Sequence, residues 1–165
     1  MVALPIITLR RIKRAAYDIL GKIKFKTTHF RTLYLDTMKS IFKRASPYAN
    51  DVMNLPVRDV EAAIPFYENI LGFQVVSRQD KPVKSVVLGR DVIQIGLAEN
   101  GGDPSQEGCF FEIDNIELAF AELKSNGLKQ DYPNYRIDKH GDISFRVFFV
   151  IAPDGLCYCL GERQS

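Results

Sequence analysis

Alternating and helically spaced apolar positions begin near residue 52. Residues 52–57 alternate apolar and polar side chains, which predicts a strand. From Val60 to Leu71, apolar residues recur at three- and four-residue steps, which predicts a helix. Asp59 is a good N-cap for that helix, and Gly72 suits the left-handed residue that often ends one. Three strand-like runs follow, at 73–77, 83–88 and 91–97.

The same order returns later in the chain. Residues 109–113 predict a strand, residues 116–126 predict a helix, and Gly127 ends it. Three further strand-like runs follow, at 135–138, 143–151 and 156–160. When the two segments are aligned so that Val57 matches Ile113, Asp59 matches Asn115. The sequence therefore predicts an internal β-α-β-β-β repeat, with modules 51–103 and 104–165 inside one domain, 51–165.

Each predicted module covers one face of its sheet with a helix and leaves the other face open. Two such modules side by side give an α+β fold: a cupped mixed sheet with helices on the outer face. A cup of this kind is a common place for a small molecule to bind.

Residues 1–50 have a different pattern and a different charge. Leu9, Ile12 and Ile19 belong to an apolar stripe with basic residues between them, and a second helical run includes Leu35 and Phe42. Residues 1–50 contain eleven Lys or Arg and two acidic residues, whereas residues 51–165 contain eleven basic and eighteen acidic residues. The sequence thus predicts a basic, amphipathic, helical N-terminal extension, 1–50, ahead of an acidic domain.

Four interpretations of this extension stay open. It suits an organelle-targeting peptide, a helix on an anionic membrane surface, a nucleic-acid contact or an accessory appendage. The acidic domain itself is not expected to bind nucleic acid. The three cysteines argue against a disulfide framework and for a reducing compartment, so we expect a cytoplasmic protein unless the extension directs it to an organelle.

Three motifs in this order resemble the vicinal oxygen chelate superfamily, which contains glyoxalase I, the bleomycin-resistance proteins and the extradiol dioxygenases. The opening LPVRDVEAAIPFYENILGF, at residues 55–73, resembles the first strand and helix of those proteins. FEIDN, at 111–115, resembles the start of their second half, and APDG, at 152–155, resembles their closing turn. The resemblance covers about 110 residues and implies the same repeated fold.

The resemblance also assigns four metal-ligand positions, which are Val52, Gln94, Gly108 and Cys159 in this sequence. Val52 and Gly108 have no donor side chain, and a catalytic metal site needs about three protein ligands. We therefore expect no metal and no cofactor.

Strand alternation also predicts which side chains line the pocket face of the cup. Glu112 is a candidate for binding a cation or acting as a base, and Phe110 is a candidate for stacking on a planar ligand. Asn54 and Gln94 are candidate hydrogen-bonding groups, and Cys159 lies on the same face. Each of these residues also has an ordinary structural explanation, as a rim, strand or packing residue.

Together these features predict a metal-independent small-molecule-binding protein, which sequesters a drug or metabolite, as in the bleomycin-resistance branch. That branch also implies a homodimer. The alternative is a lyase, isomerase or dioxygenase of the same superfamily, acting on a small organic substrate. A third hypothesis is a structural or regulatory protein whose cup is vestigial.

Overall fold

The computed structural model describes residues 39–49 and 51–164, and the described chain belongs to one compact unit that begins at Lys39. The helix expected around residues 9–23 lies outside the described residues. Two ten-residue helices are present in the described part, α3 (Val60–Asn69) and α4 (Ile116–Ser125). Neither is long and apolar enough to cross a membrane.

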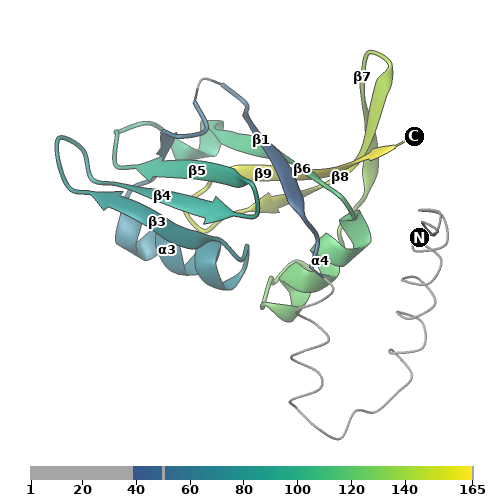
Figure 1. Ribbon diagram of the computed structural model, residues 1–165, viewed down its shortest axis with the longest axis horizontal. Coiled ribbons are helices and arrows are strands. Elements are labelled where there is room, and N and C mark those ends of the chain that lie inside the picture. Colours follow the sequence, from purple (N-terminus) through teal and green to yellow (C-terminus); the bar gives the residue numbers. More distant parts are fainter. Residues whose placement is uncertain (1–38, 50, 165) are drawn as a thin grey trace, which may run out of the picture. The chain divides into compact units, whose positions relative to one another are not determined.

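Two mixed sheets contain the strands (Figure 1). One has the order β2-β5-β4-β3, from β2 (Leu55–Pro56), β3 (Gln74–Gln79), β4 (Ser85–Arg90) and β5 (Ile93–Ala98). The other has the order β1-β6-β9-β8-β7, from β1 (Phe42–Pro47), β6 (Gly108–Ile113), β7 (Arg136–His140), β8 (Ile143–Ile151) and β9 (Cys157–Gln164). Apart from β1, the two orders are equivalent, with β2 parallel to β5 and β6 parallel to β9. The predicted repeat and the α+β class are confirmed.

The two helices start with equivalent caps. Asp59 Oδ1 accepts a hydrogen bond from Ala62 N at 3.1 Å, and Asn115 Oδ1 accepts one from Leu118 N at 2.8 Å. Each cap satisfies a backbone donor that the first helical turn leaves free. Gly72 follows α3 with a φ of 70°, a left-handed conformation that suits glycine.

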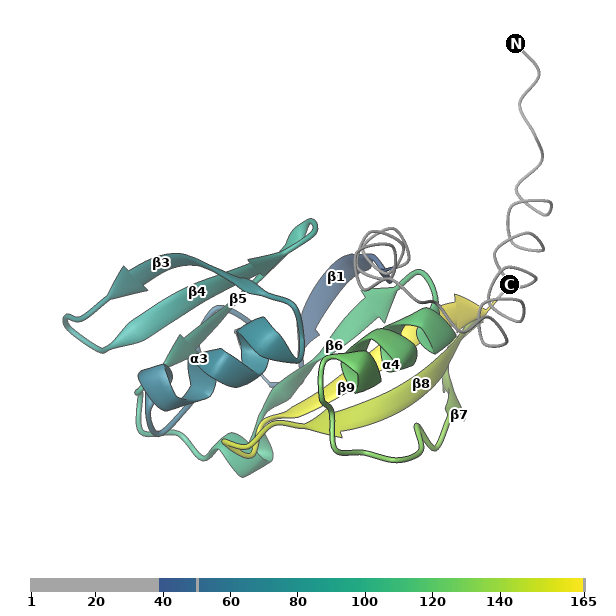
Figure 2. The same ribbon diagram turned by 90° about the horizontal axis from the view of Figure 1, so that it is seen from below.

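Both helices lie on the same side of the sheets (Figure 2). The main core fills the space between the helices and the sheets. Its aromatic members include Tyr67 from α3 and Phe111 from β6. Tyr158 of β9 stacks on Phe111 at 5.2 Å and shares a hydrogen bond with Tyr67, 2.8 Å between the two hydroxyls. Tyr67 also donates to Asp154 Oδ2 at 2.9 Å, so this buried polar group joins the two modules.

The predicted N-terminal extension needs one correction. The second helical run was expected to include Ile41 and Phe42, but Phe42–Pro47 is strand β1 and pairs antiparallel with β6. Phe42 is 1 % exposed and packs against Phe73 and Phe111, at ring-centroid distances of 6.0 and 5.2 Å. The edge of β6 offers backbone partners and the core offers a buried site for Phe42. These tertiary interactions outweigh the local helical spacing.

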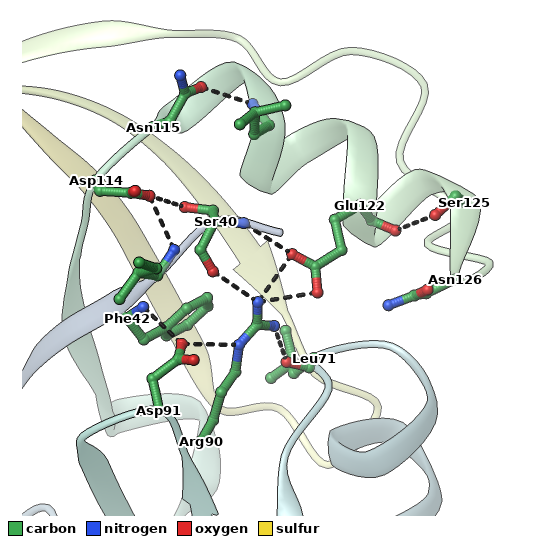
Figure 3. Close-up of polar contacts among 12 residues, drawn as sticks. Ser40, Phe42, Leu71, Arg90, Asp91, Asp114, Asn115, Glu122, Ser125 and Asn126 are labelled. Carbon is green, nitrogen blue, oxygen red and sulfur yellow. Dashed lines mark hydrogen bonds and ion pairs between the residues drawn. The ribbon is translucent and has the colours of Figure 1, made fainter. Parts of the chain in front are cut away.

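A buried arginine fixes the lead-in to β1 between the modules (Figure 3). Arg90, at the end of β4, donates from Nη2 to Ser40 O at 3.0 Å and to the carboxylate of Glu122 on α4. Its Nη1 donates to Leu71 O, and its guanidinium lies 4.1 Å from the Phe42 ring centroid. Both modules and the segment before β1 therefore meet at one side chain.

Candidate functional site

One face of the five-stranded sheet is turned away from the helices, and we call it the open face. Strand registers give its members in three rows: Glu112, Gly161, Val147 and Arg136; Phe110, Cys159 and Phe149; and Gly108, Cys157 and Ile151. Alternate residues of the same strands pack toward α4, as the contact of Phe148 with Phe120 shows. Within the described residues, neither helix covers the open face (Figure 2).

A small apolar cluster occupies the middle of this face. Phe145, Val147 and Cys159 are buried, and Phe110 and Phe149 pack against them. Phe110 meets Phe145 edge to face, with centroids 5.1 Å apart. This cluster is separate from the main core, so the sheet has apolar side chains on both faces. Phe110 and Phe149 are only partly buried, so these two rings are the aromatic members of the cluster that a ligand or partner can contact.

Charged side chains surround that cluster. Arg44 Nη2 lies 3.3 Å from Glu112 Oε2, and the Glu112 side chain is only 20 % exposed. Arg136 lies over Phe149, 4.3 Å from its ring centroid, and its Nε is 3.0 Å from Asp138 Oδ1. Glu112 is thus held by an arginine from β1, a strand that the sequence reasoning missed.

Tyr48, just after β1, adds a fourth aromatic ring to the open face. Its backbone N–H donates to Gly108 O at 3.1 Å, and its ring packs on that glycine. Its hydroxyl interacts with the Cys157 thiol and the backbone of Cys159, and burial of that end raises the pKa of Tyr48. Tyr48 was not a predicted site residue, because no local pattern marks it. Only the pairing of β1 with β6 places it there.

Three of the five predicted pocket residues, Phe110, Glu112 and Cys159, lie together on the open face. Asn54 and Gln94 belong to the other module. Asn54 accepts a hydrogen bond from Asn100 Nδ2 at 3.1 Å, in an exposed loop. Gln94 is exposed on β5 and lines a polar groove of about 810 Å³. No contact joins either residue to the first three among the interactions of the described chain.

The four metal positions implied by the resemblance do not fit a metal. A side chain at Gly108 has no room, because a Cβ there would lie 1.8 Å from Cys157 O. Burial raises the pKa of Cys159 to about 12, which disfavours the thiolate that a metal binds. Gln94 and Val52 belong to the other module. Among the described residues, no three His, Cys, Asp or Glu side chains form a metal-binding group. His140 ends strand β7 and contacts Phe145.

An apolar groove of about 650 Å³ adjoins the open face at the end of β8. Its lining includes Phe66 and Ile70 of α3, Leu128, Phe149 and Ile151. Phe149 therefore borders both the apolar cluster and the groove. This size and this apolar lining are typical of small-molecule sites.

Comparison with protein families gives the class of this fold. Residues 49–155 match the model of the Glyoxalase/Bleomycin resistance protein/Dioxygenase superfamily. The chain belongs to this superfamily, which confirms the resemblance drawn from its motifs. A comparison with curated protein sequences gave no significant match.

Solved structures with a similar fold include two bleomycin proteins. One is a bleomycin resistance determinant encoded on the transposon Tn5, with 24 % identity, coverage of 69 % of this chain and 97 % of that one, and a TM-score of 0.50. Another is the bleomycin-binding protein of Streptomyces verticillus in complex with copper(II)-bleomycin, with 19 % identity, 68 % and 94 % coverage, and a TM-score of 0.52. A protein from the mobile metagenome of V. pseudocholerae has 20 % identity, 71 % and 95 % coverage, and a TM-score of 0.54. At these identities the likeness establishes the fold alone.

Proposed function

We propose that this protein binds a small planar organic molecule on its open face, without a metal ion. The observation that carries the proposal is the aromatic and thiol cluster of Phe110, Phe145, Phe149 and Cys159 on a sheet face that neither described helix covers. Planar ligands stack on or against aromatic edges, and each such contact contributes about 0.5–1.5 kcal/mol beyond simple burial.

The charges on the open face favour a ligand with an anionic group. Glu112 and Asp138 are each engaged by an arginine, Arg44 and Arg136 respectively. Arg163 lies on the same face, since it pairs in register with Phe145, and it is exposed. Among residues 39–49 and 51–164, three guanidinium groups against two carboxylates give this face an excess positive charge, which attracts an anion.

Binding is better supported than catalysis by Glu112. A general base needs a carboxylate free to approach a substrate proton. The Glu112 carboxylate is only 20 % exposed and lies 3.3 Å from the Arg44 guanidinium, so the ion pair already occupies one of its oxygens.

The proposal is tested with 8-anilinonaphthalene-1-sulfonate, a planar aromatic anion whose fluorescence reports binding. Phe149→Ser should weaken its affinity about tenfold, which corresponds to the loss of one aromatic contact of about 1.4 kcal/mol. Val92→Ser is the matched control, because Val92 is 79 % exposed on the other module and should have no effect. Equal affinities in both variants and the wild type would contradict the site.

Metal independence and assembly have their own tests. Elemental analysis of purified protein should find less than one transition metal per chain, and one tightly held ion per chain would contradict the proposal. We also infer a homodimer, as in the bleomycin-resistance branch that the chain resembles. Sedimentation equilibrium measures this directly, and a monomer at micromolar concentration would exclude it.

A further inference from the structure

Tyr48 has an unusual position for a side chain outside regular structure. It follows the last residue of β1, and one edge of its ring lies close to Gly108 at the start of β6. A Cβ built on Gly108 would lie 3.0 Å from Tyr48 Cε2, so the ring uses the space that any other residue at 108 would fill. The residue as a whole is still 46 % exposed.

The floor beneath this ring cannot be filled by a side chain of its own. A Cβ at Gly108 would also lie 1.8 Å from Cys157 O, which is backbone and cannot move aside cheaply. The glycine is therefore required by the close approach of β6 and β9. Because it has no side chain, the Tyr48 ring can approach the backbone at this position.

Polar recognition lies at the far end of the ring. The Tyr48 hydroxyl interacts with the Cys157 thiol and with the backbone of Cys159. Cys159 is buried and Phe110 lies beside it in register, so the hydroxyl interacts with groups next to the apolar cluster. The site thus combines a close approach of the ring to the Gly108 backbone with polar partners for the hydroxyl.

We propose that the floor formed by Gly108, Cys157 and Cys159 is a subsite for a phenolic ring, and that Tyr48 occupies it as an intramolecular ligand. This inference rests on the proposed function, because it places one ring of the bound molecule at the edge of the open face. It also gives the ligand class: a planar molecule with an aromatic hydroxyl group.

Tyr48 can be displaced without loss of the sheet. It lies beyond the last paired residue of β1, Pro47, and its backbone is held to β6 by one hydrogen bond, Tyr48 N to Gly108 O at 3.1 Å. A ligand that enters the subsite must compete with this side chain. Its apparent affinity is reduced by the fraction of molecules in which Tyr48 covers the floor.

The experiment uses the full chain with Tyr48→Ala and measures the binding of p-cresol by isothermal titration calorimetry. p-Cresol is the tyrosine side chain as a free molecule. We expect it to bind the variant at least about tenfold more tightly than the wild type, because the competing ring is gone. Tyr132→Ala is the matched control, since Tyr132 is 75 % exposed and distant in sequence from the floor, and it should bind like the wild type.

Toluene, which lacks the hydroxyl group, should bind Tyr48→Ala several-fold more weakly than p-cresol. Equal p-cresol affinities in Tyr48→Ala, Tyr132→Ala and the wild type would overturn the inference. If Tyr48→Ala does not fold, an NMR titration of the wild-type protein with p-cresol tests the subsite. Saturating p-cresol should shift the amide resonances of Gly108 and Cys159. Unshifted resonances would overturn the subsite.

These outcomes are independent of the test of the proposed function. Loss of anilinonaphthalenesulfonate binding in Phe149→Ser, together with no p-cresol effect in Tyr48→Ala, would leave the open-face site standing and remove only the phenol subsite. The reverse pattern would leave the subsite and remove the aromatic cluster as the main site.

Discussion

Arg90 Nη2 donates to both carboxylate oxygens of Glu122, at 2.9 and 2.8 Å, and this ion pair joins the last residue of β4 to the middle of α4. The two side chains are 5 % and 8 % exposed. The pair links the two modules of the repeat, and Ser40 O accepts a further bond from the same guanidinium nitrogen (Figure 3). Module docking and the placement of β1 therefore depend on one another.

Removing one partner of this pair should be strongly destabilising. Glu122→Ala leaves the Arg90 guanidinium buried without its counter-charge, and such a loss costs about 3–5 kcal/mol. Urea denaturation followed by circular dichroism measures the free energy of unfolding. Glu117→Ala on the same helix is the control, because the exposed pair of Glu117 with Arg146 should contribute less than about 1 kcal/mol. Similar losses in the two variants would contradict the role of the buried pair.

Strand β1 should be part of the stable domain. Phe42→Ala removes a ring that is 1 % exposed and should lower the free energy of unfolding by about 3–5 kcal/mol. Its neighbour Ile41 is 50 % exposed, so Ile41→Ala should change stability by less than about 0.5 kcal/mol. Urea denaturation of both variants is the measurement. If residues 39–47 were only an appendage, both substitutions would be neutral.

The repeat was predictable from the sequence because both modules use the same local signals. Asp59 and Asn115 are caps at equivalent positions, and the strands between Gln74 and Ala98 alternate clearly enough to be found. Strand β1 was not predictable from local pattern, because Phe42 also fits a helical stripe. Its conformation depends on pairing with β6, more than 60 residues away in the chain.

Thiol reactivity should follow burial. Cys109 and Cys159 are buried, and burial raises the pKa of both thiols, that of Cys159 to about 12. Cys157 is partly exposed and its pKa is also raised. In native protein at pH 8, 5,5′-dithiobis(2-nitrobenzoate) should label Cys157 slowly and the other two not at all, because the thiolate is the reactive form. Labelling in urea should reach all three, and Cys157→Ser should abolish the native reaction. Fast labelling of two thiols would contradict this.

Asp154 should make stability depend on pH. Burial raises its pKa in the folded protein above the unfolded value of about 4. Between those two pKa values the folded state binds more protons than the unfolded state, so the free energy of unfolding falls as pH rises through that window. Asp154→Asn does not titrate there and retains an oxygen for the backbone N–H of Leu156, which Asp154 accepts at 3.0 Å. Urea denaturation at several pH values between 4 and 7 measures the free energy of unfolding of both proteins. The stability of the variant relative to the wild type should increase as pH rises. A constant difference between the two would contradict the effect.

The candidate site was predictable only in part. Period-two alternation correctly placed Phe110, Glu112 and Cys159 on one face, because β6 and β9 are regular strands. Alternation could not show that Asn54 lies in a loop and Gln94 in a separate sheet, or that Arg44 forms an ion pair with Glu112. Both facts depend on how the modules and β1 assemble, which no local pattern specifies.

The pairing of β1 with β6 also determines where this domain can safely be cut. The family match begins at residue 49, whereas the described compact unit begins at Lys39. A fragment that begins at residue 49 would lack β1. The backbone hydrogen-bond donors and acceptors of Cys109–Ile113 that pair with β1 would then be exposed. An unprotected strand edge of that kind recruits strands from other molecules, so the trimmed protein should aggregate rather than remain dispersed.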